Sequence, residues 1–156
     1  MKNKLIITIF LILLNFHIPK MVLADEFIFE MSNIEITDNG NIYKGKNRGK
    51  IVTDTQLELV SDNFEYLKKT NQLKTQGNVQ LFDFKNNISL NAETIFYFKD
   101  KNKISSRGKT LIKISNDYTI EGYDVTFLMD EMILLSDKNT TIKDKDLNEY
   151  TLKKFQ

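Results

Sequence analysis

"LELVSDNFEYLKKTNQLKTQGNVQL", Leu57–Leu81, decides the fold because the chain repeats it. Shifted by 31 positions, it falls without gaps on "ISLNAETIFYFKDKNKISSRGKTLI", Ile88–Ile112. A third copy, "YTIEGYDVTFLMDEMILLSDKNTTI", Tyr118–Ile142, follows at an offset near 30 and has Lys138 in place of the late glycine. A weaker copy precedes them at Asn33–Val52, with Gly49 in the role of Gly77. Repeats of this length indicate stacked supersecondary units.

Each copy predicts two strands and a turn. Apolar residues recur at every second position in "IFYF", "NVQLFDF" and "TLIKI", which is the period of a strand with one face to a core and one to water. The intervening "KKTNQ", "KDKNK" and "TDNGN" have the composition of hairpin turns. "DEMILLSD", 130–137, suits a strand better than a helical turn. We therefore predict an all-β fold, a roll or sandwich of stacked antiparallel hairpins that is elongated along the repeat axis.

Two features predict corners in the long strands. Gly77 and Gly108 enter the second strand of their copies at equal places, which indicates a bulge or bend. The apolar phase also slips within the first strand, from odd positions at Leu57 and Leu59 to even positions at Phe64 and Tyr66. A bulge or corner near 61–63, and again near 92–94, accounts for the slip.

The N-terminus reads as an export signal. Lys2 and Lys4 precede the apolar run 5–18, and Val22 and Ala24 occupy the small-residue positions that a signal peptidase recognises. We expect a signal peptide at 1–24 and a mature domain at 25–156, located in the periplasm. A retained membrane anchor is the alternative, but the run is shorter than the about 20 residues that a spanning helix needs.

Composition narrows the chemistry. Three of the 22 basic residues precede residue 25, so 19 basic and 21 acidic residues remain in the expected mature chain, and a nucleic-acid partner is not expected. The chain has no cysteine, and its one histidine, His17, lies in the signal segment. The mature chain therefore lacks a Ser-His or Cys-His nucleophile pair and a nitrogen- and sulfur-ligated zinc site. We expect no catalytic residues, no metal and no cofactor.

The repeated pattern resembles the OstA-like (organic-solvent-tolerance-like) domain of lipopolysaccharide transport. Ser61-Asp62 and Ala92-Glu93 resemble the family's Ala-Asp, and Tyr66 and Tyr97 resemble its tyrosine before the turn. "TQGNVQL" and "SRGKTLI" resemble its glycine-led strand. The resemblance covers most of residues 34–142 and weakens in the third copy, which loses the glycine and the tyrosine.

The resemblance implies a non-enzymatic periplasmic β-jellyroll that shields the acyl chains of lipopolysaccharide. It also implies edge-strand pairing, end to end, with similar jellyrolls to form a bridge between the inner and outer membranes, and hence a role in outer-membrane biogenesis. An apolar interior suffices for such a carrier, because burying acyl chains is favourable without any reactive group. The candidate lipid-binding residues are the apolar residues of the repeated strands: Leu59, Phe64, Tyr66, Leu81, Leu90, Ile95, Tyr97, Ile112, Ile120, Val125 and Phe127.

Lysines gather at the predicted turns, and two readings of them stay open. Turn lysines are ordinarily only solvated, and contact with lipopolysaccharide phosphates is the alternative. The residues concerned are Lys68, Lys69, Lys74, Lys99, Lys101 and Lys103.

Several alternatives remain open on function. An exported chain with little beyond the repeats resembles the soluble bridge protein. The stretch "LNEYTLKKFQ", 147–156, looks like a further unit that stops within a strand, which resembles the N-terminal domain of the outer-membrane translocon. A membrane-anchored bridge subunit is a third reading. From other classes, a docking module would use its strand edges without binding lipid, and a carbohydrate-active enzyme would need two fixed carboxylates in a cleft.

Overall fold

Strands make up nearly all of the regular structure. The computed structural model describes residues 27–153, so the expected signal peptide at 1–24 lies outside the described residues. Three short 3₁₀ turns, η1 (Asp38–Gly40), η2 (Lys68–Thr70) and η3 (Lys99–Lys101), follow strands in this region. The strands are β1 (Ile28–Glu30), β2 (Asn33–Thr37), β3 (Ile42–Val52), β4 (Leu57–Leu67), β5 (Gln72–Asp83), β6 (Ile88–Phe98), β7 (Lys103–Ile114), β8 (Tyr118–Tyr123), β9 (Thr126–Leu128), β10 (Ile133–Leu135), β11 (Thr140–Asp144) and β12 (Glu149–Leu152).

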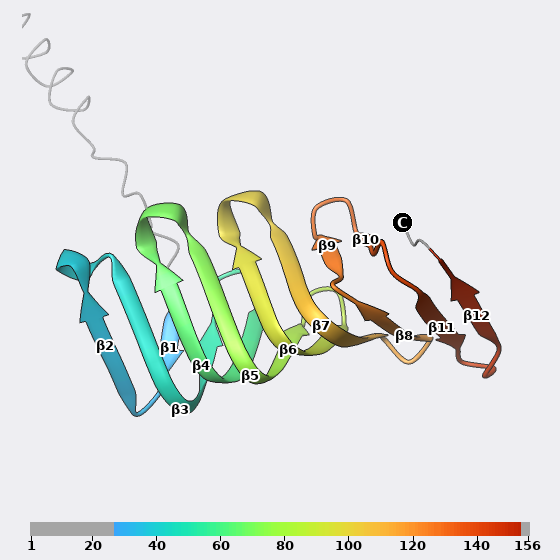
Figure 1. Ribbon diagram of the computed structural model, residues 1–156, viewed down its shortest axis with the longest axis horizontal. Coiled ribbons are helices and arrows are strands. Elements are labelled where there is room, and N and C mark those ends of the chain that lie inside the picture. The colour runs from blue at the N-terminus through green and yellow to red at the C-terminus, as the bar shows by residue number, and fades with distance from the viewer. Residues whose placement is uncertain (1–26, 154–156) are drawn as a thin grey trace, which may run out of the picture.

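All twelve strands belong to one antiparallel sheet that is bent along its length. The main path runs β1-β3-β4-β5-β6-β7-β8-β11-β12, while β2 pairs with β3, β9 with β7, and β10 with β9. Neighbours in the sheet are therefore mostly neighbours in sequence, and the strands follow one another along the long axis (Figure 1). The all-β roll of stacked antiparallel hairpins is confirmed, as one folded sheet.

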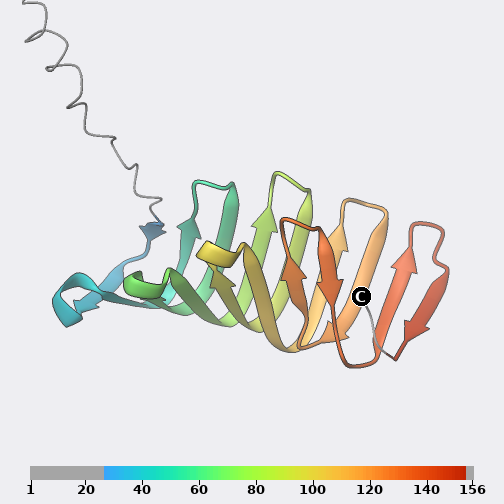
Figure 2. The same cartoon turned by 90° about the horizontal axis from the view of Figure 1, so that it is seen from above.

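The bend divides the sheet into two halves. We call the upper half residues 33–46, 63–76, 94–107 and 126–135, and the lower half residues 28–30, 49–60, 79–92, 109–123 and 140–152. The five long strands β3 to β7 cross from one half to the other. Figure 2 shows the result from above, as two rows of hairpins that diverge from a common line.

Register shifts mark the corner line between the halves. They fall between Lys46 and Gly49 of β3, Val60 and Asn63 of β4, and Gln76 and Val79 of β5. In β6 the shift lies between Ala92 and Thr94. Extra residues in a ladder bend a strand, so aligned shifts bend the whole sheet. The corners predicted near 61–63 and 92–94 are confirmed.

The predicted glycine corners are correct in two copies and wrong in one. Gly77 and Gly108 have φ of +82° and +80°, a conformation that favours glycine. In the weaker copy at Asn33–Val52, however, Gly49 is not the equivalent residue. Asn47 and Arg48, with φ of +69° and +35°, take the left-handed conformation at this corner. Asparagine tolerates that region better than most residues, so the corner does not need a glycine.

The turns stack on one another as the strands do. The N–H groups of Lys68, Lys99 and Met129 donate to the carbonyl oxygens of Asn41, Asn71 and Asn102, at 2.8, 3.1 and 2.9 Å. Asn71 and Asn102 end their 3₁₀ turns in the left-handed conformation, with φ of +45° and +41°. Each upper turn is therefore held by the asparagine of the preceding copy, which fixes the spacing of the repeats.

The third copy is the most interrupted. Where the first two full copies have continuous strands, this copy has β8 followed by β9, and β10 followed by β11. The strand predicted within 130–137 is confirmed as β10, and the stretch 147–156 contributes β12. Within residues 27–153, no helix has the length and apolar character needed to cross a membrane.

Candidate functional site: the interior between the two halves

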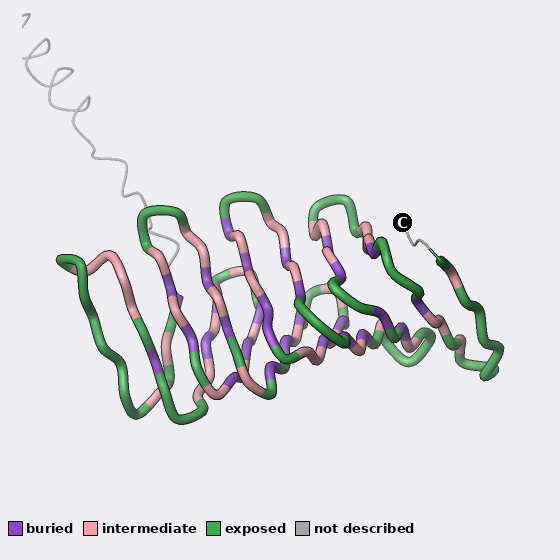
Figure 3. Tube along the Cα trace, viewed as in Figure 1, coloured by how far each residue is buried: buried purple, intermediate pink, exposed green. Residues whose placement is uncertain are grey.

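The inner faces of the two halves form one apolar interior. Figure 3 shows buried positions alternating with more exposed ones along the long strands of both halves. All eleven candidate lipid-binding residues belong to the buried core and are at most 7% exposed. The phase slips at the corners leave the inward side of the strands open in the sequence, and the structure places all eleven side chains inward. Contact with a lipid stays a prediction.

Side chains from the two halves close on each other in this interior. Leu59, Leu81, Leu90 and Ile112 come from the lower half, whereas Phe64, Ile95, Tyr97 and Phe127 come from the upper half. They share one core cluster with Leu73, Ile104 and further neighbours. An alkyl chain can enter such an interior only where the halves move apart.

Aromatic rings concentrate at the N-terminal end of the interior. Phe27 lies 4.6 Å from Tyr66 and 6.0 Å from Tyr97, between ring centroids. Phe29 stacks on Phe64 at 4.6 Å with an interplanar angle of 11°. Phe29 lies in β1 and Phe27 directly precedes it. Because β1 has only three residues, it carries no strand pattern that sequence reasoning would detect.

The corner line is built from small residues. Thr75, Ser106 and Ser136 occupy one position of the repeat. Thr110 and Thr140 occupy another, which is Val79 in the copy 57–81, and all six residues are buried. In the weaker copy at Asn33–Val52, strand pairing places Gly45 and Gly49 at these two positions. A Cβ on Gly45 would overlap the ring of Phe64, and one on Gly49 would overlap the side chain of Met31. Small side chains let the two halves approach most closely here. The repeat register shows this pattern, which the sequence analysis missed.

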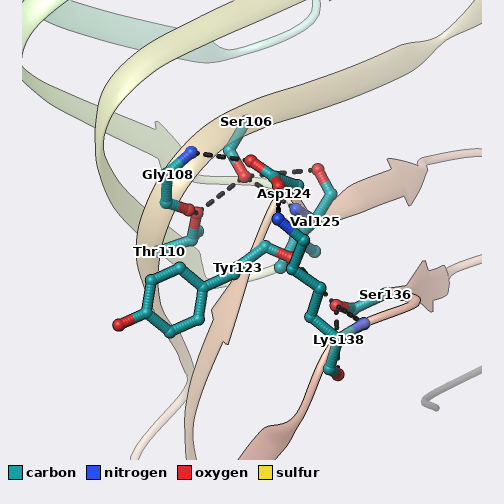
Figure 4. A network of polar contacts seen from close by, with 8 residues as sticks. All are labelled: Ser106, Gly108, Thr110, Tyr123, Asp124, Val125, Ser136 and Lys138. Atoms are coloured by element: carbon teal, nitrogen blue, oxygen red, sulfur yellow. Dashed lines mark hydrogen bonds and ion pairs between the residues drawn. The ribbon is translucent and has the colours of Figure 1, made fainter.

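Hydroxyl groups replace the backbone hydrogen bonds that the corners interrupt. Ser106 Oγ accepts the N–H of Val125 at 3.0 Å and shares a hydrogen bond of 2.7 Å with the Thr110 hydroxyl (Figure 4). Thr75 donates to the carbonyl of Ile95 at 3.2 Å. Buried backbone groups need such partners, so these hydroxyls are structural.

Charged groups close the corners from outside. Asp124 accepts the N–H of Gly108 at 2.8 Å and pairs with Lys138 at 2.5 Å (Figure 4). The Lys138 ammonium, followed by the Gly108 N–H, lowers the pKa of Asp124. Asp62 is held in the same way by Asn78 and Arg48, which lower its pKa. Lys138, which replaces the late glycine of the third copy, thus closes a corner with its side chain.

The open side of the interior, which we call the mouth, lies between the upper and lower turns. Lys99 of η3 and Asp54 of the β3–β4 turn meet across it, with Nζ and Oδ1 2.9 Å apart. The Lys99 side chain is 6% exposed and its ammonium lies 5.3 Å from the centroid of Phe27. This ion pair joins the two halves at the mouth.

A polar cleft of about 410 Å³ adjoins this pair. The lower turns contribute Asp54, Thr55, Gln56, Asp83, Lys85 and Asn86, and the upper turns contribute Asn102, Met129 and Asp130. Asp83 accepts hydrogen bonds from the backbone N–H and the side-chain amide of Asn86, and Asp130 accepts one from Asn102. The cleft thus connects the turns of both halves.

The turn lysines do not form one site. Lys69 pairs with Asp38 at 3.3 Å on the surface, and Lys103 lies over the ring of Phe98 at 4.7 Å on the outer face. Of the six lysines, Lys99 alone is buried, among the residues the structure describes. The turn composition did not distinguish it from the others.

In the part of the chain that the structure describes, the sheet ends in an edge strand on either side. At the N-terminal end every residue of β2 is exposed, including Ile34 and Ile36. At the other end β12 pairs with β11 alone among the strands of residues 27–153. Within residues 27–153, no group of three or more potential ligands is placed to hold a metal ion.

The comparisons with known proteins bear on the fold. No family model matches the chain, and no curated protein matches it. The structure is similar to that of LptH from Pseudomonas aeruginosa, described as the LptA homologous periplasmic component of the conserved lipopolysaccharide transport device. The TM-score is 0.64 at 13% identity, over 70% of this chain and 80% of LptH. The chain therefore has the β-jellyroll fold of this transport component, as its resemblance to the OstA-like domain implies.

Proposed function

We propose that this chain is a non-enzymatic periplasmic carrier in lipopolysaccharide transport and outer-membrane biogenesis, which shields acyl chains between the halves of its sheet. The placement of all eleven candidate residues in one apolar interior carries the proposal. The interior runs along the repeat axis, as a carrier of long alkyl chains requires. LptH, with the same fold, is a periplasmic component of such a device.

The energetics suit transport without catalysis. Transfer of each methylene from water to an apolar site is worth about 0.8 kcal/mol, so acyl chains supply their own driving force. Within the described residues, the chain offers them leucine, isoleucine, phenylalanine and tyrosine side chains rather than reactive groups.

Docking with similar jellyrolls would use the strand edges. An exposed edge offers unpaired backbone groups to a second strand. Strand β2 presents Ile34 and Ile36 beside such groups, and β12 offers the corresponding edge at the other end. Components of the inner and outer membranes are the partners we expect at these two ends.

Site-specific photo-crosslinking tests the carrier function. A photoreactive amino acid at Tyr97, which points inward, is expected to label lipopolysaccharide during transport in cells. The matched control is the same group at Phe96, which directly precedes Tyr97 and lies on the outer face of β6. It is expected to label lipopolysaccharide at least several-fold less. Equal labelling from both positions, or none from Tyr97 or Phe64, contradicts the carrier function.

The closed interior favours a second candidate, a docking module that binds no lipid. The core residues of this protein already fill the space between the halves. A photoreactive group at Ile36 would then label partner proteins while Tyr97 labels no lipid. The same set of variants thus separates the two functions.

A further inference from the structure

Lys99 is buried where a lysine is costly to place. Its side chain is 6% exposed, whereas that of its partner Asp54 is 41% exposed. Removing a charge from water is costly, and replacing a buried ion pair by apolar residues is often neutral or stabilising. Stability alone therefore does not explain why the chain keeps an ammonium group beside Phe27.

The location of the pair is also unusual. Ion pairs such as Lys44–Glu65 and Lys109–Glu121 join neighbouring strands of the same half and are well exposed. Asp54 and Lys99 instead come from turns of opposite halves, 45 positions apart in sequence. Separating these two groups is a step in opening the mouth.

We propose that Lys99 binds the anionic headgroup of the amphiphile whose alkyl chain enters the interior, and that Asp54 is the internal counterion which this headgroup displaces. The inference rests on the proposed carrier function. A phosphate monoester matches the ammonium group, because charge-assisted hydrogen bonds to phosphate are strong. Loss of the Asp54 contact removes one link between the β3–β4 turn and η3, so headgroup binding favours opening of the mouth.

The adjoining cleft limits the headgroup to a small anion. Lys85 adds a second cation to its wall, and Asp83 and Asp130 add carboxylates that Asn86 and Asn102 hold in place. A single phosphate reaches Lys99 while its alkyl chain points past Phe27 into the interior. A second phosphate close to the first would meet the carboxylates, so the site favours one anionic group.

Calorimetric titration with two amphiphiles tests this assignment. The probes are dodecyl phosphate and the uncharged dodecyl maltoside, both below their critical micelle concentrations. The unmodified protein is expected to bind dodecyl phosphate about tenfold more tightly, a ratio that corresponds to about 1.4 kcal/mol. Lys99→Met is expected to abolish this preference while binding of dodecyl maltoside and the melting temperature change little.

Substitution of Asp54 is expected to change the affinity for dodecyl phosphate in the opposite direction. Asp54→Asn removes the competing carboxylate and is expected to tighten binding of dodecyl phosphate several-fold, with no change for dodecyl maltoside. Asp38→Asn is the matched control, because it breaks an exposed ion pair with Lys69 on another turn. It is expected to change neither affinity.

Each failure has its own signature. If both amphiphiles bind, and Lys99→Met leaves the affinity for each of them unchanged, the headgroup site is overturned. The carrier function is not affected by that result. An effect of Asp38→Asn equal to that of Asp54→Asn also overturns the site, because general electrostatics then explains both. Failure of both amphiphiles to bind any variant overturns the carrier function, and the headgroup site with it.

Discussion

Met31 occupies the space that a side chain on Gly49 would need. A Cβ on Gly49 would overlap Met31 Cγ and lie 2.9 Å from the carbonyl oxygen of Glu30. The φ of Gly49 is not in the left-handed region, so its backbone conformation does not require glycine. Position 49 lacks a side chain because β1 and Met31 approach β3 closely. This contact closes the interior at its N-terminal end.

Gly49→Ala is expected to destabilise the protein by overpacking. Inserting a methyl group into such a contact costs about 1–3 kcal/mol, which urea unfolding measures directly. Met31→Ala in the Gly49→Ala background is expected to recover part of the loss, because it removes the overlapping side chain. Additive losses in the double variant would show that the contact is not the cause.

Gly77→Ala and Gly108→Ala separate backbone strain from crowding. Both glycines have positive φ, so both variants are expected to lose about 1–2 kcal/mol. Gly77→Ala is expected to lose more, because its Cβ would lie 2.7 Å from Asp62 Oδ2 whereas a Cβ on Gly108 meets nothing within 4 Å. Gly108→Asn is the control and is expected to restore most of the loss. Equal unfolding free energies for the two alanine variants would contradict the crowding.

Ser106→Ala is expected to lower the free energy of unfolding by about 1–3 kcal/mol, because it leaves the buried N–H of Val125 without its acceptor. Ser105→Ala is the matched control on the outer face, where the side chain bonds only weakly to the Thr126 hydroxyl at 3.2 Å. Its expected change is within about 0.5 kcal/mol. Equal losses from the two neighbouring serines would argue against the structural role of the corner hydroxyls.

Asp124 is expected to make stability depend on pH in acid. Because its pKa is lowered in the folded protein, its contribution is present above the pKa of the unfolded chain, about 3.9, and is lost as the pH falls through the folded value. Asp124→Asn is expected to reduce stability at pH 7 and to flatten the decline below about pH 4. Urea midpoints from pH 7 to pH 2 measure this. Lys138→Met removes the same ion pair, so an unchanged acid decline in that variant would contradict the assignment.

The fold could be predicted from the sequence because the sequence is repetitive. The matched copies predict the strands, the turns and two corners. The phase slips at those corners leave the inward side open, and the structure buries Phe64 and Tyr97. The pattern did not show that the halves belong to one continuous sheet, because pairing across a corner leaves no periodic mark. It also assigned the first corner to Gly49, although Asn47 and Arg48 provide its backbone conformation.

Sequence patterns did not predict the contact between Asp54 and Lys99 at the mouth. Asp54 and Lys99 lie in turns of different copies, and each turn contains several charged residues of similar appearance. Their contact depends on how far the sheet bends, which is a property of all the corners together. Likewise, Phe29 comes from a strand too short to show alternation, and Phe27 directly precedes that strand.

The stacked turns have a consequence for how such a protein can evolve. Each 31-residue copy adds two strands to the sheet, and adjacent strands lie about 4.8 Å apart, so a copy lengthens the apolar interior by about 10 Å. Its width is set separately, by the small residues at the corners. Duplication or loss of one hairpin would therefore change the length of the interior without changing the distance between the two halves. Selection can act on these two dimensions independently.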